Sequence, residues 1–179
     1  HAVVTEGGER PSIIPEFAEM KFYARSKYPE TLRELSGRIE AIVRGAALMP
    51  GTGADINWDE GPPPLPVRSS RALTGRWLSA QRRCGRDPLP AGVVSETLAA
   101  STDFGNVSYR VPGIHPLIAI SAPDVALHTR EFAAAAGSPA AATGAADGAA
   151  GLALTALDYF CDPELQRAAA QEFADAGGP

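Results

Sequence analysis

The chain has 179 residues, enough to bury the core of one ordinary domain or of two small ones. Its 16 basic and 21 acidic residues give a formal net charge of −5, which disfavours nucleic acid as a partner. No apolar run approaches the roughly 18 residues that a membrane-spanning helix needs, so we expect a soluble protein with no membrane partner.

Two features of the composition bear on location and source. Cys84 and Cys161 fit neither a disulfide framework nor a paired-cysteine metal site, so we expect buried, reduced thiols in a cytoplasmic protein. Lys21 and Lys27 are the only lysines among the 16 basic residues, and Ala and Gly are plentiful. This bias is typical of GC-rich bacterial genes and predicts a bacterial source.

The first sixty residues carry the clearest periodicity. Apolar residues 1–5 predict a strand, and alternation over residues 17–25 predicts a second, half-buried strand. A helix is predicted from Pro29 to Pro50, and alternation over residues 54–58 predicts a last strand. The helix has an apolar stripe that must pack on something, made of Leu32, Leu35, Ile39, Ile42, Val43 and Ala46.

A proline-rich stretch divides the chain. Four prolines in the five residues 62–66 exclude both a helix and a strand ladder there. We therefore predict a first domain over residues 1–60, a linker over residues 61–68 and a second domain over residues 69–179.

The second domain has weaker but readable signals. A helix is predicted over residues 69–84, and a buried strand over residues 116–121. The Ala/Gly-rich stretch 133–151 specifies little by itself and is expected to run into a helix that carries Leu152, Leu157 and Phe160. Asp162 and Pro163 supply the start of a closing helix through Phe173. The residues expected in line on the first of these helices are Leu73, Trp77 and Gln81.

Imidazole chemistry is limited to His1, His115 and His128. A histidine on the surface or in a satisfied core is the ordinary alternative for each. His115 precedes the predicted buried strand and His128 lies in a predicted strand-to-helix loop, positions at which functional side chains often occur.

A cluster of short polar residues spans 101–108. Asp103 and Asn106 either shape a site or bond backbone N–H groups in a capped turn. Ser101 and His128 permit a hydrolytic pair by composition, but the chain has no G-x-S-x-G elbow and no P-loop. Nucleotide binding is not supported.

Several ordered motifs carry a resemblance to a known family. They are His1-Ala-Val-Val-Thr-Glu-Gly-Gly8, Ile13-Ile-Pro15, Ala18-Glu-Met-Lys-Phe-Tyr-Ala-Arg25, Ser101-Thr-Asp-Phe-Gly-Asn-Val-Ser108, Val111-Pro-Gly-Ile-His-Pro116 and His128-Thr-Arg-Glu-Phe132. The first three resemble the lid domain of the zinc metallopeptidases and amidohydrolases grouped with aminoacylase, succinyl-diaminopimelate desuccinylase and auxin-conjugate hydrolases. The last three resemble the final third of the catalytic domain in the amidohydrolase branch of that family.

The resemblance implies an α/β fold class. Residues 69–179 would form the rear part of a zinc-peptidase-like α/β catalytic domain, and residues 1–60 an incomplete ferredoxin-like α+β lid and dimerisation domain. It also implies a homodimer through the lid, two zinc ions in full-length members, and hydrolysis of amide bonds in N-acyl amino acids or dipeptide-like substrates. The chain resembles a C-terminal portion of such an enzyme.

The same resemblance implies roles for individual side chains. His1 is similar to the lid histidine that reaches the active site of the partner subunit and stabilises the oxyanion of the tetrahedral intermediate. His128 is similar to the last metal-ligating histidine. The residues expected to bind substrate or shape its site are His115, Asp103, Asn106 and Arg25. For Arg25, which would pair with a substrate carboxylate, a solvated strand face is the alternative.

The ligand set of the family is incomplete in this sequence. No His-x-Asp follows any of the three histidines, and no Glu-Glu dipeptide is present to supply the general base. One histidine leaves most coordination positions of a zinc ion to water. Ser12 also stands where the family pattern has Asn. We therefore predict that this chain alone does not hydrolyse amides.

Two alternatives remain open. The chain is either a non-catalytic association module, which pairs with another subunit through a strand edge and an amphipathic helix, or one part of an enzyme whose upstream half exists in the cell. A catalytic half on its own would expose apolar surface and be poorly soluble.

Overall fold

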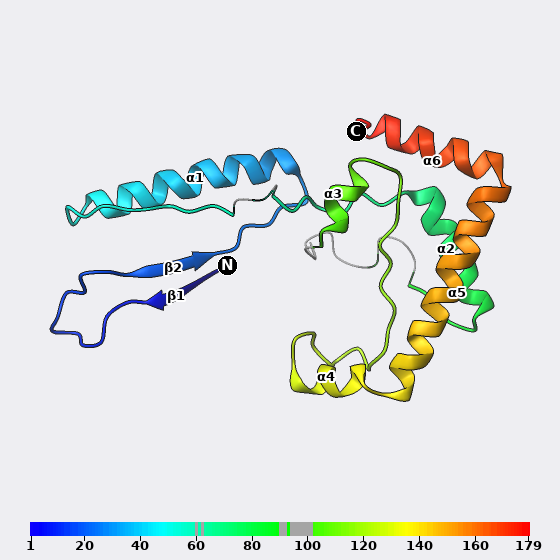
Figure 1. The fold of residues 1–179 in the computed structure, drawn as a ribbon, viewed down its shortest axis with the longest axis horizontal. Helices are drawn as coiled ribbons and strands as arrows, with labels where there is room; N and C mark the ends of the chain where they lie inside the picture. The colour runs from blue at the N-terminus through cyan, green and yellow to red at the C-terminus, as the bar shows by residue number, and fades with distance from the viewer. Residues whose placement is uncertain (60, 62, 90–92, 94–101) are drawn as a thin grey trace. The chain divides into compact units, whose positions relative to one another are not determined.

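The computed structural model describes residues 1–59, 61, 63–89, 93 and 102–179 (Figure 1). They form two compact units, with the change of unit between Pro66 and Val67. Unit 1 holds a two-stranded sheet and one helix, and unit 2 holds the other described helices. Helices with one small sheet are compatible with the predicted α/β class. The candidate Ser101 lies outside the described residues.

Unit 1 is a hairpin followed by a helix. Strands β1 (Ala2–Glu6) and β2 (Glu19–Phe22) pair antiparallel, with Val4 opposite Met20. Helix α1 (Pro29–Leu48) starts at a proline, whose fixed φ suits the first turn. The first strand and the helix were predicted from periodicity, and both are confirmed.

Other expectations for unit 1 are wrong. Every residue of both strands is exposed, and no described residue of the unit is buried. Ile42, expected in the packed stripe, is exposed, whereas Leu35 and Ile39 are half-buried. Two strands and one helix have too little contact area to bury the apolar side chains of the sheet or of α1.

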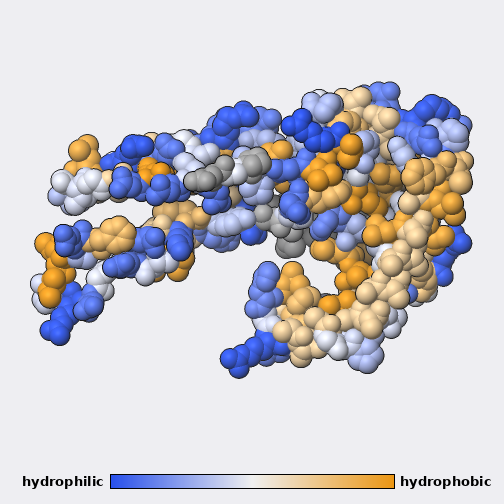
Figure 2. Space-filling model, viewed as in Figure 1, coloured by the Kyte–Doolittle hydropathy of each residue, from blue (hydrophilic) through white to orange (hydrophobic). Residues whose placement is uncertain are grey.

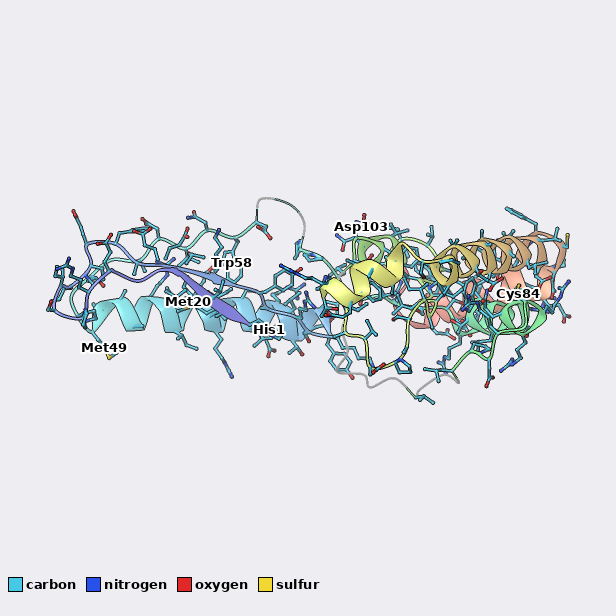
Figure 3. All side chains as sticks on the ribbon, turned by 90° about the horizontal axis from the view of Figure 1, so that it is seen from below. His1, Met20, Met49, Trp58, Cys84 and Asp103 are labelled. Atoms are coloured by element: carbon cyan, nitrogen blue, oxygen red, sulfur yellow. The ribbon has the colours of Figure 1, made fainter. Side chains whose placement is uncertain are left out.

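The strand predicted over residues 54–58 is also absent. These residues return beside α1, and the Trp58 indole Nε1–H donates to Glu40 Oε1 at 2.7 Å (Figure 3). Alternation of apolar residues favours a strand only where a neighbouring strand accepts the backbone bonds, and no described segment pairs with this one.

Unit 2 is built from helices α2 (Arg71–Arg83), α3 (Phe104–Ser108), α4 (Arg130–Ala136), α5 (Pro139–Cys161) and α6 (Pro163–Asp175). Leu73 of α2 packs with Leu165 and Ala169 of α6 in a small core. Trp77 and Gln81 are buried one and two turns further along α2, so the predicted line of residues on this helix is confirmed.

The Ala/Gly-rich stretch forms most of α5. Glycines are buried on its inner face at positions 144 and 151, and the large residues Leu152, Leu157 and Phe160 are exposed. A Cβ at Gly151 would overlap Gln81 Nε2 and lie 2.7 Å from Trp77 Cζ3. The missing side chains therefore let α2 approach α5 closely.

We expect Gly151→Ala to lower the free energy of unfolding by about 2 kcal/mol, because the added methyl group has no room beside the indole ring. Gly75→Ala in α2 is the matched control, since a Cβ there meets nothing within 4 Å. It should stabilise the chain by about 0.5 to 1 kcal/mol through helix propensity. Thermal or urea unfolding measures both, and equal melting temperatures for the two variants would contradict the packing argument.

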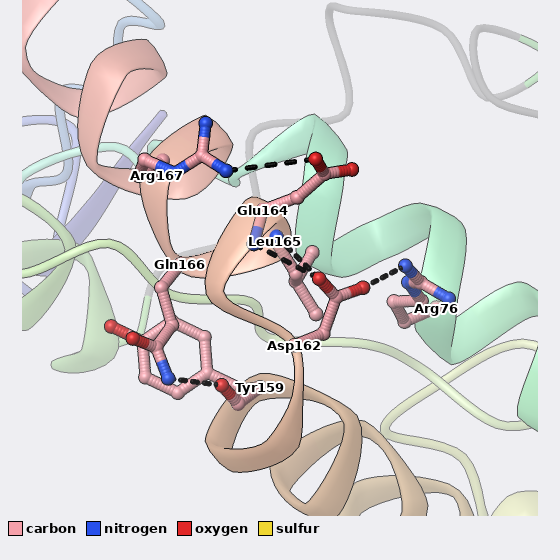
Figure 4. Close-up of polar contacts among 7 residues, drawn as sticks. All are labelled: Arg76, Tyr159, Asp162, Glu164, Leu165, Gln166 and Arg167. Atoms are coloured by element: carbon pink, nitrogen blue, oxygen red, sulfur yellow. Dashed lines mark hydrogen bonds and ion pairs between the residues drawn. The ribbon is translucent and has the colours of Figure 1, made fainter.

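The junction of α5 and α6 confirms the predicted cap. Asp162 Oδ1 accepts hydrogen bonds from the backbone N–H groups of Glu164 at 2.9 Å and Leu165 at 3.2 Å (Figure 4). Its Oδ2 atom lies 2.6 Å from Arg76 Nη2 of α2. One carboxylate thus starts α6 and ties the junction to α2.

Three further predictions from the sequence can be compared with the structure. The buried strand predicted over residues 116–121 is not formed, because no described segment lies beside it as a ladder partner. The cysteines are unpaired, but Cys161 is exposed and Cys84 partly so, which makes the predicted burial wrong. None of the described helices is long and apolar enough to cross a membrane.

Candidate functional site

The open end of the hairpin places His1 opposite Tyr23. The Tyr23 N–H donates to His1 O at 2.8 Å, and the His1 amino group donates to Tyr23 O at 3.0 Å. These bonds extend the β1–β2 ladder by one residue pair, so the position of His1 is fixed relative to the residues that follow β2. Figure 3 labels His1 at this end of β1.

A pocket of about 280 Å³ opens at this end of unit 1. Phe22 and the α1 residues Leu35 and Ile39 supply apolar walls, and His1 and Arg25 supply polar ones. The structure therefore brings together two residues that the sequence analysis singled out separately, the proposed oxyanion-stabilising histidine and the proposed carboxylate-binding arginine.

Arg25 is oriented by the neighbouring aromatic ring. Its guanidinium carbon lies 4.5 Å from the centroid of the Tyr23 ring, and Arg25 forms no ion pair with any described residue. A guanidinium that lies beside a ring and is not already paired with a carboxylate has N–H donors available for one. The pocket can therefore hold a small molecule with an apolar part and an anionic end.

Sequence reasoning missed Tyr23 as a pocket wall. The signal was present, because Tyr23 and Arg25 share one face of the alternating stretch over residues 17–25. Leu35 and Ile39 were predicted as apolar packing residues of α1, and they line the pocket rather than a buried core.

Three other candidates lie near one another in unit 2. The His115 ring stacks on the Phe104 ring with centroids 5.4 Å apart, and Phe104 follows Asp103 directly. The Asn106 N–H donates to Asp103 O at 3.0 Å. Asp103 was a candidate cap for this turn, but its side chain makes no such bond, and Thr102 Oγ1 accepts from the Phe104 N–H instead.

His128 is exposed, on the segment before α4, with a left-handed φ of 64°. The next residue, Thr129, caps α4 by accepting a hydrogen bond from the Phe132 N–H at 3.2 Å. The described part of the chain holds no group of three His, Cys, Asp or Glu residues able to bind a metal ion together. The donors present therefore do not form the paired zinc site that the resemblance implies.

This geometry predicts the behaviour of the isolated chain toward zinc. We expect the purified full chain, equilibrated with zinc and desalted, to retain well under one ion per chain, because a single imidazole holds zinc weakly. Elemental analysis measures the ratio, and His128→Ala should leave it unchanged. Two ions per chain would show that the chain itself contains a full ligand set.

Comparison with known proteins extends over almost the whole chain. No family model matches. Two curated relatives do: mouse Xaa-Arg dipeptidase is 35% identical over 173 residues, which cover 97% of this chain and 40% of the mouse protein. Human Xaa-Arg dipeptidase is 32% identical over 173 residues, or 39% of the human protein. Both relatives are mammalian, so they do not support the expected bacterial source. The chain is thus similar to Xaa-Arg dipeptidases and spans about two fifths of the length of these two relatives.

Proposed function

We propose that this chain supplies part of a dipeptidase of the zinc metallopeptidase and amidohydrolase family, one that acts on dipeptides with a C-terminal arginine. The observation that carries the proposal is the 35% identity to mouse Xaa-Arg dipeptidase across 97% of this chain. It narrows the range of substrates expected from the sequence, N-acyl amino acids or dipeptide-like molecules, to dipeptides. Because the chain spans 40% of that relative, the proposed activity is that of a whole enzyme to which these residues contribute one part.

Unit 1 would bind one end of the substrate. Arg25 is the proposed partner of the terminal carboxylate, since its guanidinium lies over the Tyr23 ring and has no ion pair among the described residues. His1 lines the same pocket and is the proposed donor to the oxyanion that forms when the peptide carbonyl is attacked. A homodimer through unit 1 would bring this pocket to the active site of the partner subunit.

Unit 2 would contribute to the reaction centre. His128 is the proposed metal ligand, and His115, Asp103 and Asn106 are proposed to shape the substrate site. The family resemblance implies two zinc ions, but the described residues do not fit them, since they contain no group of three ligands. The remaining ligands and the general base must therefore come from elsewhere in the assembled enzyme.

An association module is the second candidate function. It is favoured by unit 1, in which no described residue is buried and the apolar residues of both strands are exposed. Such a surface suits pairing with another subunit. A module of this kind would associate without contributing to turnover, so substitutions in the pocket would leave the activity of any complex unchanged.

The test uses the full chain co-expressed with the part of mouse Xaa-Arg dipeptidase that lies outside the matched residues. Release of free arginine is measured from alanyl-arginine, with alanyl-alanine and N-acetyl-arginine as comparison substrates. The proposal predicts preference for alanyl-arginine. Equal or faster release from N-acetyl-arginine would contradict the dipeptide preference and favour N-acyl amino acids as substrates. A stable complex without turnover would favour the association module.

A further inference from the structure

The rings of Phe104 and His115 form a stacked pair on the surface of unit 2. Their centroids lie 5.4 Å apart and their planes are inclined by 28°. Phe104 is half-buried and His115 is exposed. Within the part of the chain that the structure describes, no hydrogen bond or ion pair joins the His115 side chain to another residue. The imidazole is therefore supported by one ring and accessible to a ligand.

The rest of unit 2 fixes both members of the pair. A Cβ at Gly113 would lie 2.7 Å from Phe104 Cζ, so the glycine lets this ring lie against the backbone that leads to His115. Gly113 O accepts a hydrogen bond from the Ser70 N–H at 2.9 Å, and Ile114 packs against the helical core. A ligand that stacks on a pair fixed in this way loses little free energy to ordering of the protein.

A carboxylate lies at the same turn. Asp103 directly precedes Phe104 and the helix α3, and it is exposed (Figure 3). Its Oδ1 atom accepts from the Thr102 hydroxyl at 3.3 Å, but the side chain accepts no capping hydrogen bond and has no ion pair with a described residue. Its negative charge is therefore available to a cation from outside the chain.

The surface along α5 suits a different kind of contact. Figure 2 shows that apolar residues gather along this helix. Its large exposed residues are Leu152, Leu157 and Phe160. Of its two carboxylates, Asp147 is already paired with Arg86 at 2.6 Å, and Asp158 is half-buried. A cationic group is therefore better served by the turn at Asp103 than by α5.

We propose that Asp103, Phe104 and His115 form a subsite for a guanidinium group, and that this subsite takes the arginine side chain of the dipeptide. The choice of ligand rests on the proposed function. A guanidinium is planar, so it can stack on the exposed imidazole while its N–H edge donates to the carboxylate. Arg68 of the same chain already lies between two aromatic rings. A citrulline side chain has a similar shape without the charge, and should bind less well.

Proton NMR of the full chain tests the subsite without requiring turnover. The chain has three histidines, so the imidazole signals of His115 can be assigned by their loss in His115→Ala. Alanyl-arginine at millimolar concentration should shift these signals saturably, and alanyl-citrulline should bind about tenfold more weakly or less well still. Asp103→Asn should weaken the binding of alanyl-arginine about tenfold, because the hydrogen bonds to a charged acceptor are lost.

Asp87→Asn is the matched control. Asp87 is another exposed carboxylate of unit 2, and it has no ion pair with a described residue. The control should leave the affinity within about twofold of the parent, and both variants should melt as the parent does. The proposal would be overturned by the absence of a saturable His115 shift, by equal binding of alanyl-citrulline, or by equal affinities of Asp103→Asn and Asp87→Asn. A shift confined to His1 would place the ligand in the pocket of unit 1 instead.

Turnover by the complex with the unmatched part of the mouse relative separates this subsite from the proposed function. In that complex Asp103→Asn should raise the KM for alanyl-arginine about tenfold and leave the KM for alanyl-citrulline within about twofold. Binding at His115 without arginine release by the complex would support the subsite and contradict the proposed function. Arginine release with a KM that Asp103→Asn leaves unchanged would support the proposed function and overturn the subsite.

Discussion

Replacing Arg25 with alanine is expected to raise the KM for alanyl-arginine about 10- to 100-fold in the co-expressed complex, with a smaller change in kcat. A hydrogen bond to a charged group contributes about 1.5 to 3 kcal/mol, and the carboxylate is present in both the bound substrate and the transition state. Arg25 lines the pocket beside His1 and forms no ion pair with a described residue, so no other partner would mask its loss.

Two variants separate carboxylate binding from net charge. Arg25→Lys keeps the charge but lacks the planar fork, so it should recover only part of the affinity. Arg33→Ala removes an exposed arginine of α1 that does not line the pocket, and it should leave the KM within twofold of the parent. If Arg25→Ala and Arg33→Ala gave the same KM, the pocket of unit 1 would not be the carboxylate site.

Arg68→Ala is expected to lower the free energy of unfolding by about 3 kcal/mol and to loosen α6. The guanidinium lies between the rings of Tyr109 and Phe173, 4.6 and 4.4 Å from their centroids. It also donates to the backbone carbonyls of Ala176 and Gly178, each at 2.8 Å, at the end of α6. Two hydrogen bonds from a charged donor and two ring contacts together account for a loss of this size.

The backbone of Arg68 adds a second link, because its N–H donates to the buried Ser108 hydroxyl of α3 at 2.9 Å. The alanine variant keeps that bond and loses both carbonyl contacts at the end of α6, so the loss should fall mainly on α6. Exchange of the α6 amides should accelerate while those of α3 change little. Arg82→Ala, in an exposed position of α2, is the control. Its free energy of unfolding should differ from that of the parent by less than about 0.5 kcal/mol. Equal effects of the two variants would contradict the role assigned to Arg68.

Helix starts were predictable because their signals are local. Pro29 and Asp162 act within one turn of their own position, and both begin a helix where the sequence placed one. The line of Leu73, Trp77 and Gln81 was equally readable, since a helix that packs on one side must repeat its apolar residues at this spacing.

Strands were predicted less well because a strand depends on a partner that the local sequence does not contain. Residues 54–58 alternate and residues 116–121 form a short apolar run, and neither segment has a described neighbour to accept its backbone bonds. The inner face of α5 was missed for another reason. Its glycines carry no apolar signal, yet they determine how closely Trp77 and Ile120 approach the helix.

The candidate site was only partly accessible to sequence reasoning. Position in a predicted loop made His128 a candidate, with a surface role as the alternative, and the family resemblance supplied the proposed functions of His1 and His128. The structure adds that His1 and Arg25 share one pocket. The sequence of this chain does not identify the other ligands of a metal site around His128. The described residues contain no group of three potential ligands to which His128 could belong.

The most direct test of the central claim is the rate of arginine release from alanyl-arginine by the full chain, measured alone and then with the unmatched part of mouse Xaa-Arg dipeptidase. The account predicts no release above background by the chain alone and clear release by the complex, which requires both parts. Zinc-dependent turnover by the chain alone would contradict the claim that its ligand set is incomplete.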